Sequence, residues 1–220
     1  MKMRSFTIAI AGTHSTGKST FLAALCKELE SLGLKVGYVR ELAVAARKAD
    51  FGILREHSYE STLWIITRGI SEELAAANRA QVVLVDRPVP DALGYLRAAL
   101  SHRGEKINRR TYDYLQDITK GHLPRYDILY KSVLSPAIPM DRSKKRDPDL
   151  EFRSQVADCI NDVFDELGVD ANDLRNDQWR AAIAFCRRRV MAHFELTSAQ
   201  TYRSLQTASN GWNPSGAASS

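Results

Sequence analysis

A glycine-rich loop, GTHSTGKS, follows a short apolar run close to the start of the 220-residue chain. The run, residues 6–11, is apolar and contains β-branched members, which predicts a buried strand. From Lys18 onward, apolar side chains recur at spacings of three and four as far as Leu32. This spacing predicts a helix, and Gly33 can end it. A strand, a small polar loop and a helix in direct succession constrain the fold more than any other feature of the sequence.

The loop matches the phosphate-binding pattern G-x-x-x-x-G-K-[ST] from Gly12 to Ser19. Its glycines allow a tight turn in which successive N–H groups surround phosphate oxygens, and the helix adds its positive N-terminus. Lys18 is expected to reach the β- and γ-phosphates, and the Ser19 hydroxyl to bind Mg²⁺. The loop therefore predicts binding of a nucleoside triphosphate, ATP, together with Mg²⁺. The expected nucleotide contacts are Gly12, Thr13, His14, Ser15, Thr16, Gly17, Lys18, Ser19 and Thr20.

Strand and helix patterns alternate along the first 170 residues. The alternation predicts an α/β protein with the three-layer fold of P-loop NTPases, a parallel sheet with helices on both faces. A fifth buried strand is not expected, because the segment VDANDLRNDQ after Gly168 is too polar. Strands are expected at residues 6–11, 35–39, 81–86 and 126–134, and helices at 18–32, 60–80, 87–104, 108–121 and 147–168.

These patterns divide the chain into three parts. Residues 1–169 form the predicted core, which includes a lid near 140–153. Residues 170–206 form a C-terminal helical extension, whose amphipathic pattern starts at Trp179. Residues 207–220 are small and polar, so we expect a disordered tail.

Composition and charge fit a protein that binds anionic ligands. A net charge of +5 suits nucleotides and is compatible with nucleic acid. No segment approaches the ~20 apolar residues of a membrane span, and the first apolar run is short for a signal peptide. We therefore expect a cytoplasmic protein with no membrane partner. Three widely spaced cysteines argue against a disulfide framework and against zinc. The oligomeric state stays open, with a dimer as one option.

The apolar run VVLV ends in Asp86 and Arg87. In P-loop folds a strand of this kind lies beside the first strand, so Asp86 is expected to face Mg²⁺ or the phosphoryl acceptor. Arg87 follows directly and Asp91 comes one helical turn later, which places both at the same predicted cleft. The alternatives are a surface role for Arg87 and a helix-capping role for Asp91.

Four residues after the second predicted strand are candidates for contact with the acceptor. Arg40 and Glu41 directly follow that strand, at the edge where ligands bind in such sheets, and a carboxylate there can accept the proton of a hydroxyl. The alternative for this pair is a surface ion pair at a helix start. Tyr59 and Trp64 could stack on a base, and the alternative for Trp64 is a place in the core.

A basic segment, MDRSKKRDPD, precedes the last core helix and predicts a lid over the transferred phosphoryl group. Arg142 and Arg146 are the expected lid arginines, because a guanidinium offers a planar fork to phosphate, and Arg153 is a weaker third. The alternative is a solvated basic loop. The predicted catalytic residues are Lys18, Glu41, Asp86, Arg87, Arg142 and Arg146.

Taken together, the motifs GTHSTGKST, RE, VDR and DRSKKRDPDLEFR resemble those of P-loop kinases. They are most similar to the AAA-type ATPase and kinase family that includes the ribosylnicotinamide kinase domain, and more distantly to deoxynucleoside kinases. The resemblance covers residues 6–168 and implies transfer of a phosphoryl group from ATP to a hydroxyl of a nucleoside-like acceptor. By analogy it implies that Glu41 is the base and Asp86 the acid beside Mg²⁺, although the two assignments can be exchanged.

Three functions are compatible with the sequence. The first is a P-loop phosphotransferase, a kinase that acts on an alcohol group of a nucleoside- or nucleotide-like small molecule. The second keeps the chemistry but places the hydroxyl on DNA or RNA, which the basic lid and the run CRRRVMAHF favour. The third is a switch protein that hydrolyses ATP to change a partner contact.

Overall fold

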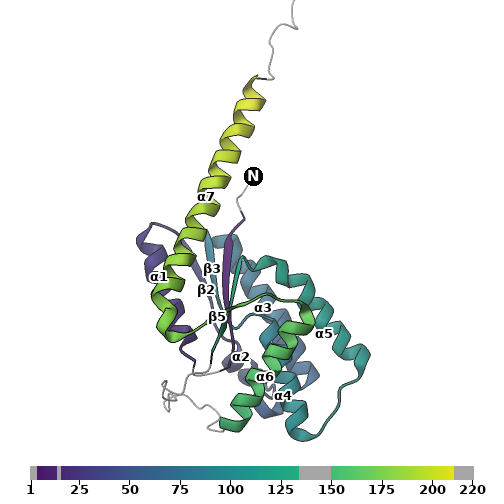
Figure 1. Ribbon diagram of the computed structural model, residues 1–220. Coiled ribbons are helices and arrows are strands. Elements are labelled where there is room, and N and C mark those ends of the chain that lie inside the picture. Colours follow the sequence, from purple (N-terminus) through teal and green to yellow (C-terminus); the bar gives the residue numbers. More distant parts are fainter. Residues whose placement is uncertain (1–3, 14–15, 134–149, 211–220) are drawn as a thin grey trace, which may run out of the picture.

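The computed structural model describes residues 4–13, 16–133 and 150–210, and for residues 196–210 it describes the backbone alone. Five parallel strands form one sheet in the order β2-β3-β1-β4-β5, with helices on both faces (Figure 1). The predicted α/β three-layer fold is therefore confirmed. The strands are β1 (Phe6–Ala11), β2 (Val36–Val39), β3 (Val82–Asp86), β4 (Ile128–Ser132) and β5 (Asn172–Leu174). The α-helices are α1 (Lys18–Ser31), α2 (Ala43–Lys48), α3 (Tyr59–Arg79), α4 (Pro90–Arg103), α5 (Arg109–His122), α6 (Leu150–Leu167) and α7 (Trp179–Asn210).

Strand β1 lies at the centre of the sheet and is buried along its whole length. Successive side chains of a strand point to opposite faces, so each face of β1 packs against a different helix layer. Ile8 and Ile10 pack with α1 and α7, while Ala9 and Ala11 pack with α4 and α6. Packing on both faces fixes the end of β1, and with it the start of the glycine-rich loop.

Helices α4 and α6 approach each other closely at Gly94. A Cβ atom on Gly94 would lie 2.4 Å from Cγ1 and 3.0 Å from Cα of Ile160. The first distance is shorter than real Cβ contacts and the second is tighter than most of them, so the approach depends on glycine. Helix α5 forms an outer layer against α3 and α4 through apolar residues that include Leu93, Leu96 and Leu115. This layer holds the N-terminal end of α4 in place.

The C-terminal part of the chain differs from the sequence prediction. A fifth strand, β5, does exist and pairs with β4 from Tyr130↔Asn172 to Ser132↔Leu174. Its polar composition is tolerated because it is a short edge strand in which only Leu174 is buried. Helix α7 ends at Asn210, beyond the residue at which the tail was predicted to start. The division into core, extension and tail stays a prediction.

Smaller differences concern helix starts. The helix predicted from residue 87 begins at Pro90, and α2 was not predicted. The predicted capping residues of α6, Asp147 and Pro148, lie outside the described residues. None of the helices within the described ranges combines the length and the apolarity that a membrane crossing requires.

Candidate active site

The loops that follow β1, β2 and β3 meet at one edge of the sheet. The parallel register pairs Ile10 with Asp86 and Val39 with Val85, so the carboxyl ends of these strands lie side by side. Ligands of open parallel sheets bind at this edge. The register therefore brings Asp86 and Glu41 to the glycine-rich loop, as the sequence predicted.

The loop after β1 has the backbone conformation that its glycines allow. Gly12 has a φ of 124° and Gly17 a φ of 83°, a region that residues with a side chain rarely adopt. Gly17 is the N-cap of α1 and offers no side chain to the first-turn amides. These amides and the positive end of the helix thus suit an anion. His14 and Ser15 lie outside the described residues.

Lys18 lies beneath the loop, where it is 5% exposed. Its ammonium group donates hydrogen bonds to the carbonyl of Thr13 and, over 3.3 Å, to Oγ1 of Thr16. Burial and the charge of Arg87 lower the pKa of Lys18 to about 8. The residue is thus held as a buried cation in contact with the loop backbone.

Asp86 and Ser19 form a hydrogen-bonded pair beside the loop. Oγ of Ser19 donates to Oδ2 of Asp86 over 2.6 Å, and the hydroxyl of Tyr38 is 3.4 Å from the same oxygen. The second oxygen, Oδ1, is buried and has no hydrogen-bond partner among the described residues. A hydroxyl and an unpartnered carboxylate oxygen are ligands that suit Mg²⁺. No cluster of three His, Cys, Asp or Glu side chains that could hold a metal occurs within the described ranges, so Mg²⁺ would also need phosphate oxygens.

Arg87 connects the loops that follow all three strands. Its Nε donates to Oε2 of Glu41 over 3.1 Å, and its Nη1 donates to the carbonyl of Gly12 over 3.0 Å and to the hydroxyl of Tyr95 over 2.8 Å. Burial opposes its charge, but Tyr95 and the nearby carboxylates outweigh burial and raise the pKa of Arg87. A surface role for Arg87, the alternative at the sequence level, is therefore wrong.

Asp91 contacts the first residue of the loop. The amide of Gly12 donates to Oδ2 of Asp91 over 3.0 Å, and Nη1 of Arg87 lies 3.8 Å from the same oxygen. Burial raises the pKa of Asp91 to about 7, against the opposing charges of Arg87 and Lys18. The N-cap of α4 is Val89 and makes no side-chain cap, so Asp91 does not act as the helix cap.

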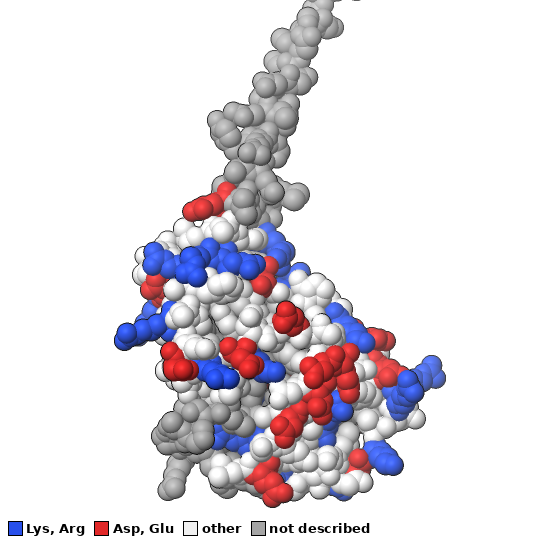
Figure 2. All heavy atoms as spheres, viewed as in Figure 1, with Lys and Arg blue, Asp and Glu red and all other residues white. Residues whose placement is uncertain are grey.

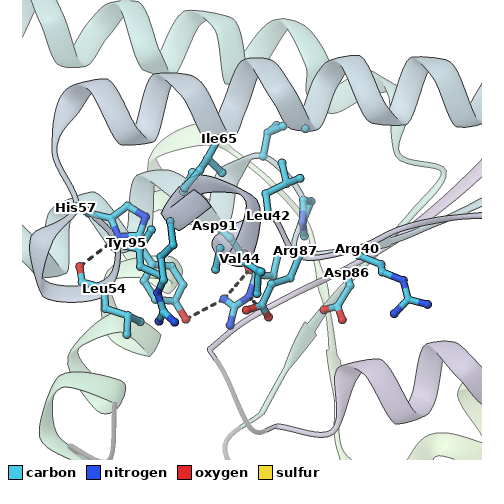
Figure 3. Close-up of a pocket in the computed structure, with 18 of the residues that line it drawn as sticks. Arg40, Leu42, Val44, Leu54, His57, Ile65, Asp86, Arg87, Asp91 and Tyr95 are labelled. Atoms are coloured by element: carbon cyan, nitrogen blue, oxygen red, sulfur yellow. Dashed lines mark hydrogen bonds and ion pairs between the residues drawn. The ribbon is translucent and has the colours of Figure 1, made fainter. Parts of the chain in front are cut away.

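A cavity of about 560 Å³ opens beside Asp86 and Arg87 (Figure 3). In Figure 3, Asp86 and Arg40 lie toward one end, His57 and Leu54 lie toward the other, and Tyr95, Asp91 and Arg87 lie between them. The lining residues are Ser19, Tyr38, Arg40, Glu41, Leu42, Ala43, Val44, Arg47, Ile53, Leu54, His57, Ile65, Gly69, Asp86, Arg87, Pro88, Val89, Asp91, Ala92 and Tyr95. One end of the cavity is thus charged, and most of the remaining wall is apolar.

Six residues predicted from the sequence line this cavity, namely Ser19, Arg40, Glu41, Asp86, Arg87 and Asp91. Tyr59 and Trp64 do not line it. Tyr59 packs with the apolar residues between α3, α4 and α5, and Trp64 packs on Phe51 with 5.5 Å between ring centroids. Both lie on α3, whose cavity-facing positions are Ile65 and Gly69.

The predicted lid arginines, Arg142 and Arg146, lie outside the described residues. Arg153, the weaker third candidate, is buried on α6. Thr13 and Thr16 are buried in the loop, whereas Thr20 is exposed on the first turn of α1. Lys18 contacts the loop from within.

Two residues that support the site were not predicted. The hydroxyl of Ser132, at the end of β4, donates to the carbonyl of Ala11 over 2.9 Å and lies 2.8 Å from Oγ1 of Thr16. His57, which precedes α3, lines the far end of the cavity. No spacing pattern in the sequence marks either residue, because both reach the site through the sheet order and the chain path.

A family model described as "AAA domain" matches residues 7–181 of the chain. No curated protein sequence gives a significant match. A crystal structure of the NadR protein in complex with NR has 16% identity and a TM-score of 0.64, and the match covers 82% of this chain and 50% of that one. This chain thus spans half the length of the NadR chain.

Two kinases share the fold at similar identity. The thymidylate kinase from Ehrlichia chaffeensis has 18% identity and a TM-score of 0.53, with 79% of this chain and 88% of that chain covered. The deoxyadenosine kinase from M. mycoides, whose structure holds dCMP and a flexible dCDP, has 16% identity and a TM-score of 0.55. That match covers 85% of this chain and 99% of the kinase.

Proposed function

Because this chain belongs to the AAA domain family, we propose that it is an ATP-dependent kinase that phosphorylates a hydroxyl of a nucleoside- or nucleotide-like small molecule. The observation that carries the proposal is the position of the cavity against the Ser19–Asp86 pair. A cavity of about 560 Å³ is in the range of small-molecule sites. Phosphoryl transfer requires the acceptor cavity to adjoin the site of the phosphoryl donor, because the acceptor hydroxyl must lie in line with the transferred group.

The residues around the loop would bind the phosphoryl donor. The amides between Gly12 and α1 would bind phosphate oxygens, and Lys18 would neutralise their charge once its ammonium group exchanges the Thr13 carbonyl for a phosphate. Ser19 and Asp86 would hold Mg²⁺, and Oδ1 of Asp86 has no hydrogen-bond partner among the described residues that would compete for it. Bound Mg²⁺ would offset the charge on the transferred phosphoryl group.

Glu41 is the better candidate for the general base. Asp86 already accepts a hydrogen bond from Ser19 and sits where the metal is expected, while Glu41 lines the cavity and its side chain is 31% exposed. Its hydrogen bond from Arg87 orients the carboxylate at the cavity wall. A base must come within hydrogen-bond reach of the acceptor hydroxyl, and Glu41 can do so from the cavity wall.

The end of strand β5 indicates where the adenine group of ATP would bind. The chain after Leu174 emerges at the same edge of the sheet as the glycine-rich loop, since β4 lies between β5 and β1. We infer that residues 175–178 flank the base of ATP.

The small-molecule acceptor is favoured over a hydroxyl on nucleic acid. Figure 2 shows basic side chains gathered where α7 leaves the body of the protein. Arg187 of α7 pairs with Glu28 over 3.1 Å, and Glu28 lies ten residues after Lys18 on α1. At about 1.5 Å per residue, this pair is roughly 15 Å along α1 from the loop. The arginines of α7 are therefore too far from the cavity to hold a DNA or RNA strand with its hydroxyl at the reacting position.

Labelled ATP with Mg²⁺, incubated with separate nucleosides, nucleotides and a DNA oligonucleotide, tests the proposal. We expect phosphate on a nucleoside-like hydroxyl, a loss of transfer in Lys18→Ala, and a loss of about 100-fold or more in kcat for Glu41→Gln. ATP hydrolysis that no acceptor accelerates would favour a switch protein instead. Transfer that survives in Lys18→Ala would contradict the proposed mechanism.

A further inference from the structure

The far end of the cavity contains a histidine that the proposed reaction does not use. His57 is 5% exposed and lines the cavity wall. In Figure 3 it lies beyond Tyr95 as seen from Arg87 and Asp86. The ring of His57 stacks on Tyr95 with 5.4 Å between centroids and 30° between planes. His57 is therefore packed into the cavity wall, at the end of the cavity away from the expected phosphate.

One hydrogen bond fixes which ring nitrogen of His57 carries the proton. Nδ1 lies 3.2 Å from the carbonyl oxygen of Leu54. A carbonyl can only accept, so Nδ1 must be the donor, and in a neutral imidazole Nε2 is then an acceptor. Burial, reinforced by the charges of Arg87 and Arg103, lowers the pKa of His57 to about 4 and keeps the ring neutral.

The acceptor nitrogen of His57 has no partner in the described part of the chain. Among the described residues, the hydrogen bonds of its side chain are confined to the Leu54 carbonyl. Nε2 keeps some exposed surface. It belongs to a ring that lines the cavity, so we infer that it faces an N–H or O–H group of a bound ligand. A neutral acceptor of this kind would repel a ligand carbonyl placed at the same point.

The chain around His57 is held in one conformation. Leu54 has a φ of 61°, and its carbonyl also accepts from the amide of His57 over 3.2 Å. Arg103, at the end of α4, donates to the carbonyl of Arg55 and, over 2.9 Å, to the carbonyl of His57. The acceptor nitrogen is thus positioned before any ligand binds, which is the condition for strong discrimination by one hydrogen bond.

We propose that His57 determines acceptor specificity by receiving a hydrogen bond from an N–H or O–H donor on the ring of the acceptor, at the end of the cavity opposite Asp86. The inference rests on the proposed kinase function, since it assigns that acceptor a chemical class. Besides the polar groups of Tyr95, Asp91 and Arg87, the cavity lining includes apolar side chains such as Leu42, Ile65 and Val89. The acceptor is thus a hydroxyl compound with a flat apolar ring whose far edge carries a donor, such as the exocyclic amine of a nucleoside base.

Pairs of nucleosides that differ only in this amine test the proposal. Adenosine is compared with purine riboside, and cytidine with pyrimidin-2-one riboside, by calorimetric binding and by phosphate transfer from ATP. In the wild type we expect at least one pair in which the amine-bearing member binds and reacts about 10-fold better or more, because its analogue leaves Nε2 without a partner. In His57→Phe, which keeps a flat ring but removes the acceptor, the ratio falls to within about 3-fold.

Two further variants guard the interpretation. His57→Gln offers an amide oxygen as acceptor, so it should retain part of the preference for the amine-bearing nucleoside. This variant keeps the proposal testable if His57→Phe folds poorly. His102→Phe changes a histidine that packs edge-on against Phe152 outside the cavity, and it should leave the ratio unchanged. If the amine-bearing nucleoside binds better than its analogue but no phosphate is transferred, the kinase proposal is wrong and the role of His57 stands. If the wild type and His57→Phe show the same ratio of transfer to the amine-bearing nucleoside and to its analogue, the role of His57 is wrong and the kinase proposal stands. A failure of all four nucleosides to bind would also contradict the role of His57.

Discussion

The carboxylate of Asp91 accepts a hydrogen bond from the amide of Gly12, with 3.0 Å between Oδ2 and the nitrogen. The carbonyl of the same glycine accepts from Arg87 over 3.0 Å. Both polar groups of the first loop residue are thus held by the segment that follows β3. The cavity wall and the glycine-rich loop are therefore connected by hydrogen bonds. A substitution at Asp91 should change the affinity of the loop for ATP.

Asp91→Ala should weaken ATP binding by roughly 5- to 100-fold, because the Gly12 amide and Arg87 both lose a buried partner. Asp91→Asn keeps an oxygen that can accept from the amide, so it should retain most of the affinity. Calorimetric titration with ATP and Mg²⁺ measures both variants. Equal affinity in Asp91→Ala and the wild type would show that the loop does not depend on Asp91.

Asp86→Asn should raise the Mg²⁺ concentration needed for half-maximal transfer by about 10- to 100-fold. The substitution replaces a carboxylate oxygen, the unpartnered Oδ1, with a neutral amide group at the expected metal position. Asp173→Asn, on the exposed edge strand β5, is the matched control and should leave the Mg²⁺ dependence unchanged. An unaltered Mg²⁺ curve for Asp86→Asn would move the metal away from Asp86.

Asp91 and His57 should make opposite contributions to the pH dependence of stability. Burial raises the pKa of Asp91 from 3.8 to about 7, so its contribution is present below pH 3.8 and is lost as the pH rises through 7. Burial lowers the pKa of His57 from 6.5 to about 4, so its contribution is present above pH 6.5 and is lost as the pH falls through 4.

Chemical denaturation between pH 4 and pH 7.5 separates these two effects. Relative to the wild type, Asp91→Asn should gain free energy of unfolding as the pH rises, whereas His57→Phe should gain it as the pH falls. The wild-type curve alone is a poor test, because the two contributions offset each other in the same interval. Parallel curves for all three proteins would contradict both shifts.

Gly94→Ala should lower the free energy of unfolding by about 1–3 kcal/mol. The added Cβ would lie 2.4 Å from Cγ1 and 3.0 Å from Cα of Ile160, so α4 and α6 would have to separate. Gly121→Ala on α5 is the control, since nothing lies within 4 Å of its Cβ position and alanine favours a helix. Urea denaturation of both variants gives the comparison, and equal stability would mean that the two helices can move apart at little cost.

Local sequence patterns determined the elements that carry the nucleotide. The spacing of Gly12, Gly17, Lys18 and Ser19 predicts the loop, because glycine adopts the required φ angles far more readily than other residues and the helix that follows presents its first amides to phosphate. The apolar run that ends in Asp86 likewise predicts the buried strand beside it. These predictions succeed because the chemistry depends on residues that are adjacent in the chain.

The contacts of the site between segments that are distant in the chain were decided by the tertiary structure. Sheet order brings Ser132 of β4 to the loop, and the chain path before α3 brings His57 to the cavity, although neither carries a sequence signal. The same path turns Trp64 toward Phe51 and away from the cavity. Strand β5 escaped prediction because an edge strand needs only one buried side chain, Leu174. Contacts between distant segments depend on packing and register, which local periodicity does not specify.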